Sequence, residues 1–569
     1  MAKAKNKHRS SAKAANPLAL KPGMSIGAAD AADDKGWLFQ CFEDSGLLSE
    51  IRSLDSAKFI IKGRTGSGKS ALLLKLEREA ENVIRIDPGH LCLQHISNSD
   101  ILRFIEKNEV RLEPFLEIIW KHTFATELLR RKYRVFNADT SVSIFSQLIN
   151  TVHASRRRSI EYLRDFGLEI WPEFEERVTA VTKKVEDEIK AELGLAELGF
   201  PLTAGGTHTT TLEEKQEIRR RIQKVLGANQ LSRLQTVIQF MADEVFTDAR
   251  RPYYVIIDDL DRFHVDDAIR LRLIRALIDV VKKFRPISNV RFCIALRSDL
   301  LEEIFEKTRD QGFQEEKYDD SIITIRWNRD QLFRLIEKRI SELYRRKHTK
   351  DNVKFYDVFA EQVAHQATRE YILDRTLMRP RDAILFVNEC LERGADKLNV
   401  GPAIIKDAES TYSRKRLDSL RDEWLNLYPL LPDYLEPLRG KPSHFEARFF
   451  DAEEMRDLAL KVATTAQTDV DRLGAFAIRA VNGAEDFNHW AFEKEWLRHL
   501  YKVGVLGIKN SGYATMLWSY KDKQEVLADE ISLETRVEIH PMVRLALGTI
   551  PASGATPGQR RKKLRSLPA

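Results

Sequence analysis

Short apolar runs alternate along this chain with longer stretches in which apolar residues recur periodically. The runs predict buried strands at residues 57–61, 82–88 (ended by Pro88), 253–257, 290–297 and 322–327. Between most of them, apolar residues recur at steps of three and four, which predicts amphipathic helices. Strands that alternate with helices in this way indicate an α/β fold with a parallel sheet.

Two regions are predicted to be almost wholly helical, an insertion at 96–230 and a helical lid at 329–428. In the insertion, apolar residues on a charged background form a stripe typical of a coiled-coil-like arm: Phe174, Val178, Val181, Val185, Ile189 and Leu193. Such an arm would either project to meet a partner or another copy of the protein, or fold back as an intramolecular helical hairpin.

The C-terminal part, residues 429–550, begins at a proline-rich break. Its clearest helix has an apolar side, formed by Phe492, Trp496, Leu500 and Val503. Strand candidates follow at 504–508 and 513–520, and this order of helix and hairpin resembles a winged helix. Another side of the helix is basic and would either follow nucleic-acid phosphates or lie as a solvated face: Lys494, Arg498 and Lys502.

Between the first two predicted strands lies the pattern G-x-x-x-x-G-K-[ST], formed by Gly63, Arg64, Thr65, Gly66, Ser67, Gly68, Lys69 and Ser70. A strand precedes it and a helix follows, which is the context of a phosphate-binding loop. The glycines would let backbone N–H groups turn inward around the phosphates of ATP, beside the positive end of the helix dipole. Lys69 would then lie between the β- and γ-phosphates, and the Ser70 hydroxyl would hold Mg²⁺. The alternative is an ordinary glycine-rich turn.

Two acids, Asp258 and Asp259, follow the apolar run 253–257. The run predicts a buried parallel strand that delivers both carboxylates to the sheet edge at which open α/β sheets bind ligands. There Asp258 would hold Mg²⁺, and Asp259 would orient and deprotonate the attacking water. The alternative is a buried strand followed by an acidic turn.

Two arginines are candidates for contact with the nucleotide. Arg297 ends the run 290–297 at the same predicted edge, where it would either sense the γ-phosphate or pair with Asp299 or Glu302. Arg381 lies beside a proline that marks the first turn of a predicted lid helix, from which its side chain could reach back to the nucleotide.

Composition narrows the class of protein. With 43% hydrophobic and 31% charged residues, the chain of 569 residues has the balance of a soluble protein with several domains. It has no run of eighteen apolar residues and no secretory segment, so we expect a cytoplasmic protein without a membrane span. The cysteines are single and far apart, which predicts a reducing compartment and no structural zinc: Cys41, Cys92, Cys293 and Cys390.

The net charge of +6 is distributed unevenly. Residues 1–22 and 551–569 carry eleven lysines and arginines and no acid, so the body between the two tails is −5. Attraction to DNA would therefore come from the tails or from a local patch. The alternative is that the tails are disordered solubilising ends.

The motifs at 63–70 and 254–262, together with Leu296-Arg297 and Arg379-Pro380-Arg381, resemble the AAA+ lineage of P-loop ATPases over about residues 25–400. The Asp-Asp-Leu-Asp-Arg form of the acidic segment is similar to the KAP and STAND branches. The resemblance implies that Lys69 and Ser70 belong to Walker A and that Asp258 and Asp259 are the Walker B pair. It also implies that Arg297 is sensor 1 and Arg381 sensor 2.

Two features depart from the family's pattern: the residue at position 259, and the lack of an arginine finger that the sequence identifies. Many AAA+ proteins have Glu at the position of Asp259, so hydrolysis would be slow. KAP proteins often carry transmembrane helices in the interval of the insertion, whereas the insertion here is polar. Members of these branches commonly act as oligomerising switches, many of them in bacterial conflict and phage defence.

The sequence thus predicts a P-loop ATPase core at 25–95 and 231–328, the insertion at 96–230, the lid at 329–428, a winged-helix-like domain at 429–550, and basic tails at 1–24 and 551–569. The expected function is an ATP- and Mg²⁺-dependent switch that couples nucleotide occupancy to homo-oligomerisation or to activation of an effector protein. One alternative is a DNA-binding ATPase that acts through the winged helix and tails. Another is a P-loop kinase for a small acceptor, which hydrolysis without an acceptor would exclude.

Overall fold

A computed structural model describes residues 19–86, 110–133, 184–185, 187–193, 212–260, 267–309, 316–346, 352–466, 472–482, 488–510 and 513–551. The chain divides into two compact units. One consists of Asp44–Ile325, and the other joins Met1–Glu43 to Arg326–Ala569. Residues 25–43, which the sequence assigned to the predicted ATPase core, lie in the same unit as the predicted lid at 329–428.

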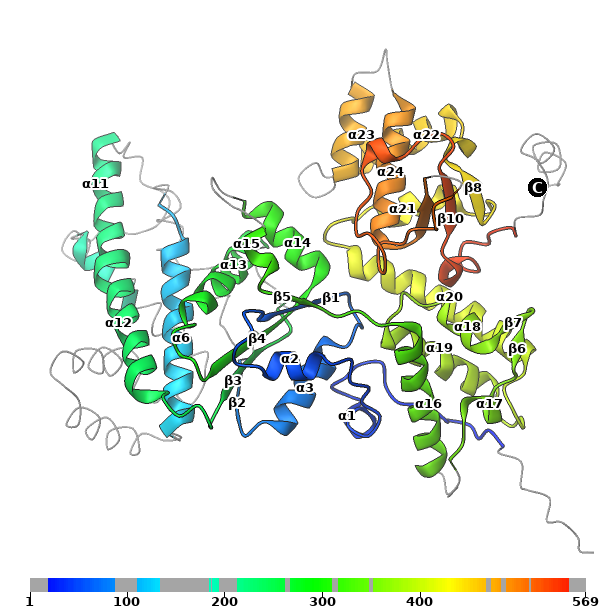
Figure 1. Cartoon of the computed structure of the whole chain (residues 1–569). Helices are drawn as coiled ribbons and strands as arrows, with labels where there is room; N and C mark the ends of the chain where they lie inside the picture. Colours follow the sequence, from blue (N-terminus) through cyan, green and yellow to red (C-terminus); the bar gives the residue numbers. More distant parts are fainter. Residues whose placement is uncertain are drawn as a thin grey trace, which may run out of the picture. The chain divides into compact units, whose positions relative to one another are not determined.

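The unit Asp44–Ile325 is built on a five-stranded parallel sheet in the order β2-β3-β4-β1-β5 (Figure 1). Its strands are β1 Ile60–Gly63, β2 Asn82–Ile86, β3 Tyr253–Ile257, β4 Val290–Arg297 and β5 Ile322–Thr324. Every residue of β3 is buried, as expected for a strand covered on both faces. The predicted α/β fold with a parallel sheet is confirmed.

Helices cover both faces of this sheet. Successive side chains of β4 point to opposite faces and show which helix covers each one. Phe292 points to the face of α6 (Glu113–Tyr133), where its ring lies 4.9 Å from that of Phe124. Cys293, one residue on, points to the opposite face and donates its thiol to the Ile51 carbonyl in α2 (Leu47–Arg52). The remaining helices around the sheet are α3 Lys69–Glu79, α13 Asp267–Lys283, α14 Ser298–Lys307 and α15 Glu316–Asp319.

The described part of the insertion belongs to the core of this unit. Helices α11 (Leu212–Gln223) and α12 (Ser232–Phe240) are joined by the π-helical η2 (Lys224–Leu231), and η3 (Met241–Val245) follows; α12 lies beside α6 in Figure 1. Val185 and Ile189 of the predicted stripe are fully buried in the same apolar cluster as α6 and the sheet. This favours the hairpin over a projecting arm. Phe174, Val178 and Val181 lie outside the described residues.

Helices dominate the first part of the other unit. They are α1 Lys35–Leu38, α16 Arg329–Arg346, α17 Phe355–Val358, α18 Thr368–Leu373, α19 Pro380–Arg393 and α20 Pro402–Trp424, with the two-stranded sheet β6 Gln362–Val363 and β7 Gln366–Ala367. The helix α19 begins with the proline at its first turn, as predicted. A buried ion network of four charged side chains ties α19 to α20: Arg379, Asp382, Arg416 and Glu423.

The second part of this unit combines helices with a small antiparallel sheet. The helices are α21 Leu431–Leu435, α22 Ala452–Thr465, α23 Arg472–Asn482 and α24 His489–Val503, with short 3-10 turns η4 Glu436–Leu438, η5 Ala447–Phe449, η7 Ala528–Glu530 and η8 Pro541–Val543. The sheet has the order β8-β10-β9, from β8 His444–Glu446, β9 Leu506–Lys509 and β10 Arg536–Ile539. The strand expected at 513–520 is not formed, since only Leu517 pairs there, in an isolated bridge to Ile508.

Candidate functional site

The loop between β1 and α3 has a backbone that requires glycine. Gly66 and Gly68 have φ of 77° and 99°, in the left-handed region that side chains disfavour. A Cβ atom on Gly63 would lie 2.4 Å from the Ser67 hydroxyl oxygen, so the chain folds closely over this residue. The glycines of the motif are therefore needed for the turn itself.

Lys69 and Ser70 are the first residues of α3, and Lys69 folds back over the loop. Its ammonium donates hydrogen bonds to the carbonyl oxygens of Gly63 (2.9 Å) and Arg64 (3.2 Å). The N-terminus of α3, an eleven-residue helix, faces the same turn and brings the positive end of its dipole there. One fixed cation and one helix terminus thus meet at this loop, which suits an anion.

Asp258 follows β3 directly, and the residue is 6% exposed. Oδ1 accepts a hydrogen bond from the Asp259 N–H at 2.9 Å. Oδ2 is buried and has no hydrogen-bond partner among the described residues. Because a buried carboxylate oxygen without a donor costs free energy, this atom is suited to a cation that binds oxygen, such as Mg²⁺.

Asp259 adopts φ of 59°, one of five non-glycine residues with positive φ in the described chain. Aspartate tolerates this left-handed conformation better than most residues, at some cost in free energy. Asp261 and Arg262, which complete the acidic motif, lie outside the described residues.

Strand register brings these segments to one edge of the sheet. Ile60, the first residue of β1, and Ile257, the last residue of β3, both pair with Ile294 in β4, so β1 extends three residues further than β3 towards this edge. Across the sheet, β1 and β3 are two strand spacings apart, about 10 Å. After β1 the chain runs towards β2, whereas after β4 it crosses to β5, and a crevice forms at such a switch point in open α/β sheets.

Arg297 lies at this edge, where it pairs in register with Gly63. Its guanidinium makes two hydrogen bonds to the carboxylate of Asp299, Nη2 to Oδ2 at 2.6 Å and Nε to Oδ1 at 3.1 Å. The sequence left two roles open for Arg297, sensing the γ-phosphate or pairing with a nearby acid. The contact seen in the structure is the pairing with Asp299. Part of the charge of Arg297 is therefore balanced within its own turn, and a sensor role stays a prediction.

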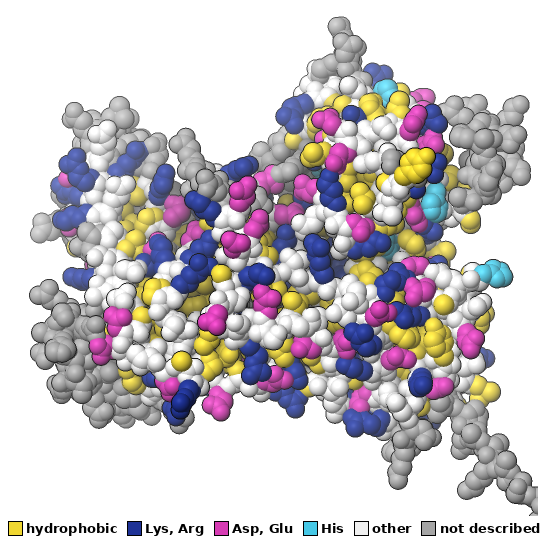
Figure 2. Space-filling model, viewed as in Figure 1, with side chains coloured by type: hydrophobic (Ala, Val, Ile, Leu, Met, Phe, Trp, Pro, Cys, Tyr) yellow, Lys and Arg dark blue, Asp and Glu magenta, His cyan; other side chains and the backbone are white. Residues whose placement is uncertain are grey.

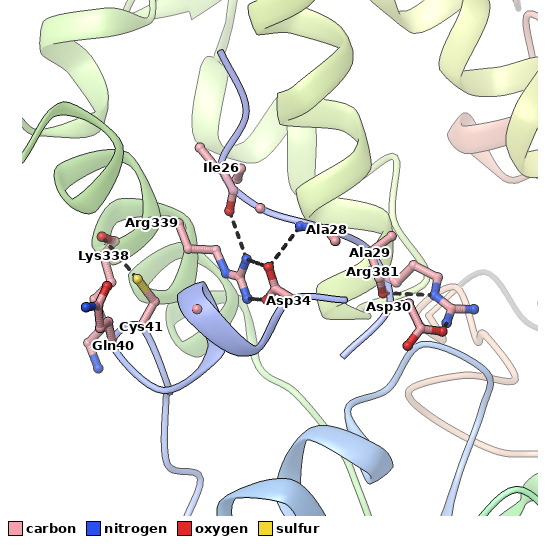
Figure 3. Close-up of polar contacts among 12 residues, drawn as sticks. Ile26, Ala28, Ala29, Asp30, Asp34, Gln40, Cys41, Lys338, Arg339 and Arg381 are labelled. Atoms are coloured by element: carbon pink, nitrogen blue, oxygen red, sulfur yellow. Dashed lines mark hydrogen bonds and ion pairs between the residues drawn. The ribbon is translucent and has the colours of Figure 1, made fainter. Parts of the chain in front are cut away.

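Arg381 lies in the other unit, on α19, and its side chain reaches the N-terminal segment (Figure 3). Nε donates to the Ala29 carbonyl at 3.3 Å, and Nη2 lies 3.9 Å from the Asp30 carboxylate. Burial lowers the pKa of this guanidinium. These contacts are within its own unit, and a role as sensor 2 also stays a prediction.

A buried set of polar contacts holds residues 26–34 against α16, and it was not predicted from the sequence. The buried guanidinium of Arg339 bonds the Asp34 carboxylate and the Ile26 carbonyl, and Oδ1 of Asp34 also accepts from the Ala28 N–H at 2.8 Å (Figure 3). Partners 305 residues apart leave no local pattern.

Comparison with known proteins gives two partial matches. Residues 330–421 match the FunZ-associated C-terminal helical domain. This range coincides with α16 to α20 and with the predicted lid. The chain is also 23% identical over 416 residues to an 80.3 kDa protein of Escherichia coli (strain K12) that is named for transposon gamma-delta. The match covers 71% of this chain and 52% of the relative, so the chain spans about half the length of the curated relative it matches.

Within the described part of the chain, no helix combines the length and apolar character needed to cross a membrane.

Proposed function

We propose that this protein binds ATP with Mg²⁺ at the edge formed by β1 and β3, hydrolyses it, and couples nucleotide occupancy to assembly or to activation of a partner. The observation that carries the proposal is the pairing of two features at one edge. The glycine-dependent loop holds Lys69 at a helix N-terminus, and the buried Oδ2 of Asp258 has no protein partner among the described residues.

The proposed roles follow from chemistry. Backbone N–H groups of 63–70 and the ammonium of Lys69 bind the β- and γ-phosphates, and the Ser70 hydroxyl and the Asp258 carboxylate hold Mg²⁺. When bound, Mg²⁺ supplies charge stabilisation to the transferring phosphoryl group. Asp259 orients the attacking water and accepts its proton. Arg297 stabilises the γ-phosphate after exchange of part of its contact with Asp299.

On this proposal the sheet is a P-loop core of the AAA+ lineage, of KAP or STAND type, and 330–421 is its lid. The three helices α22 to α24 around the sheet β8-β10-β9 support a winged-helix-like domain. The setting that the resemblance suggests is bacterial antiphage defence, with homo-oligomers and an effector protein as partners.

The test begins with hydrolysis of ATP by the full chain without any acceptor. Lys69→Ala and Asp258→Asn should each lower the rate by at least about 100-fold, as expected for groups that stabilise transition-state charge. Lys75→Ala, on the same helix, and Asp248→Asn, exposed ahead of β3, are matched controls that should keep the wild-type rate. The proposed ATPase activity would be refuted if the wild-type protein did not hydrolyse ATP, or if the two variants were as active as the controls.

The switch is tested by the mass of the protein in solution with and without ATP. Asp259→Asn should bind ATP but hydrolyse it slowly, and should therefore stay in the ATP-dependent assembly longer than the wild type. Lys69→Ala should show one mass in both conditions. A monomer in every condition, with and without DNA, would remove the coupling to assembly.

A DNA-binding ATPase is the second candidate, and the name of the transposon relative favours testing it. The basic side of α24 gives it limited support, because Arg498 pairs with Glu495 and Lys502 with Glu525. On the face drawn in Figure 2, basic and acidic side chains of the described residues are interspersed. The candidate predicts hydrolysis stimulated by DNA and binding that weakens steeply with salt, through the tails 1–24 and 551–569.

A further inference from the structure

A cavity of about 340 Å³ lies in the second part of the unit that contains the lid. Its wall is formed by Tyr428 after α20, by α23, by α24, and by residues 525–526. Two contacts hold α24 in place there. Trp496 Nε1 donates to the Tyr434 carbonyl at 2.9 Å, and Arg498 Nε donates to the Val526 carbonyl at 2.7 Å. The cavity is thus built from fixed elements, as ligand sites commonly are.

The charges around this cavity do not balance. Arg498 donates two hydrogen bonds to Glu495, and Lys502 Nζ lies 2.7 Å from the Glu525 carboxylate. Arg479, on α23, is exposed and makes no hydrogen bond or ion pair with any described residue. The wall therefore holds three cationic side chains against two carboxylates, and a ligand that complements it must bring negative charge.

Aromatic rings line the same cavity. The His499 ring meets Tyr428 edge to face at 4.9 Å between centroids, and its Nδ1 lies 2.5 Å from the Glu495 carbonyl. Because a carbonyl only accepts, Nδ1 carries the proton, which fixes the orientation of the ring. Phe476, on α23, adds a third ring that is partly buried against the core. Ring faces beside cations suit a ligand with a planar ring as well as an anionic group.

We propose that this cavity binds the phosphate and base of a nucleotide, either free or at the end of a nucleic-acid strand. The guanidinium of Arg479 bonds the phosphate, with Arg498 beside it, and the base lies against the rings of Tyr428 and Phe476. A volume of about 340 Å³ admits one nucleotide unit rather than a duplex. The site is separate from Gly63–Ser70, which lies in the other unit, so it stands whether or not the protein hydrolyses ATP.

The experiment measures binding to the full chain that carries Lys69→Ala, which removes the first proposed nucleotide site. The probes are AMP, GMP and a short single-stranded DNA oligonucleotide. Binding of each probe is measured by calorimetry or fluorescence anisotropy. In this background, Arg479→Gln removes the proposed phosphate-binding charge and Ala475→Phe fills the cavity without changing charge. Lys494→Gln is the control, because it removes a cation from α24, the other helix that lines the cavity, at a position outside the cavity wall.

Arg479→Gln and Ala475→Phe should each weaken binding by about 10- to 100-fold, the range for a lost charge-assisted hydrogen bond, while the control stays near the parent affinity. Loss in the AMP or GMP arm assigns the site to a free nucleotide, and loss confined to the DNA arm assigns it to a strand end. Unchanged thermal unfolding shows that each variant is folded. No binding of any probe by the parent, or equal binding by the parent and Arg479→Gln, would overturn the proposal.

Discussion

Glu493 carries a carboxyl group that the folded protein keeps uncharged at neutral pH. The side chain lies on the buried side of α24, is 2% exposed, and its Oε1 has no hydrogen-bond partner among the described residues. Burial, with a smaller effect of the nearby Glu454 carboxylate, raises the pKa of Glu493 from 4.5 to about 8. In the unfolded chain the same group ionises near 4.5, so folding at pH 7 must bind a proton.

The effect on the free energy of unfolding follows from the pKa values of Glu493 in the folded and unfolded chain. A pKa raised in the folded state leaves stability unaffected below about pH 4.5 and lowers it progressively up to about pH 8. At pH 7 the loss is about 3 kcal/mol, and at pH 5 it is below about 1 kcal/mol. Glu493→Gln keeps the shape and removes the titration. We expect it to raise the free energy of unfolding at pH 7 by about 2–3 kcal/mol and to have little effect at pH 5.

The assay is denaturant unfolding at pH 5, 6, 7 and 8, followed by fluorescence of tryptophans such as Trp424 and Trp496, which are buried in this unit. Glu453→Gln, an exposed position on α22, is the control and should change stability at no pH. A Glu493→Gln variant no more stable than the wild type at pH 7, or a gain that is the same at pH 5 and pH 8, would refute the reasoning.

Two further predictions concern the loop and the lid. Gly63→Ala places a Cβ atom 2.4 Å from the Ser67 Oγ, so ATP affinity measured by calorimetry should fall by about tenfold or more. Adding Ser67→Ala should restore part of this affinity, because the nearest atom of residue 67 is then 3.3 Å away. Equal affinity of Gly63→Ala and wild type would show that the loop does not hold the ligand. Arg379→Met leaves the buried carboxylates of Asp382 and Glu423 short of a partner and should cost about 3–5 kcal/mol in denaturant unfolding, whereas Arg393→Met, an exposed pair on the same helix, should cost under about 1 kcal/mol. Equal losses for the two arginines would contradict the buried network.

The sheet was predictable because its strands are buried on both faces. Such strands appear as continuous apolar runs, and β3 and β4 have the predicted bounds. The prediction of a strand at 513–520 was wrong, because this segment has no such apolar run. Its residues alternate poorly, and Leu517 pairs only in a single bridge, so the segment lacks the ladder that would make it a strand.

The candidate site was predictable where one local segment determines it. The glycines, Lys69 and the acids after β3 are adjacent in sequence to the strands that place them. The strand order was not predictable, because it depends on which strands pair and not on any one run. The pairing of Arg297 with Asp299 was one of two options, and only the side-chain geometry distinguishes them.

The path of the chain at β5 bears on how a nucleotide could act on the rest of the protein. Ile325 is the last residue of its unit, and its N–H donates to the Lys62 carbonyl at 2.9 Å, one residue before the glycine loop. A Cβ on Gly63 would lie 3.6 Å from the Ile325 side chain. The chain leaves for the other unit at the next residue, Arg326. A shift of the loop upon phosphate binding would therefore act directly on one of the two points at which the chain passes between units, so the proposed switch needs no long relay of contacts.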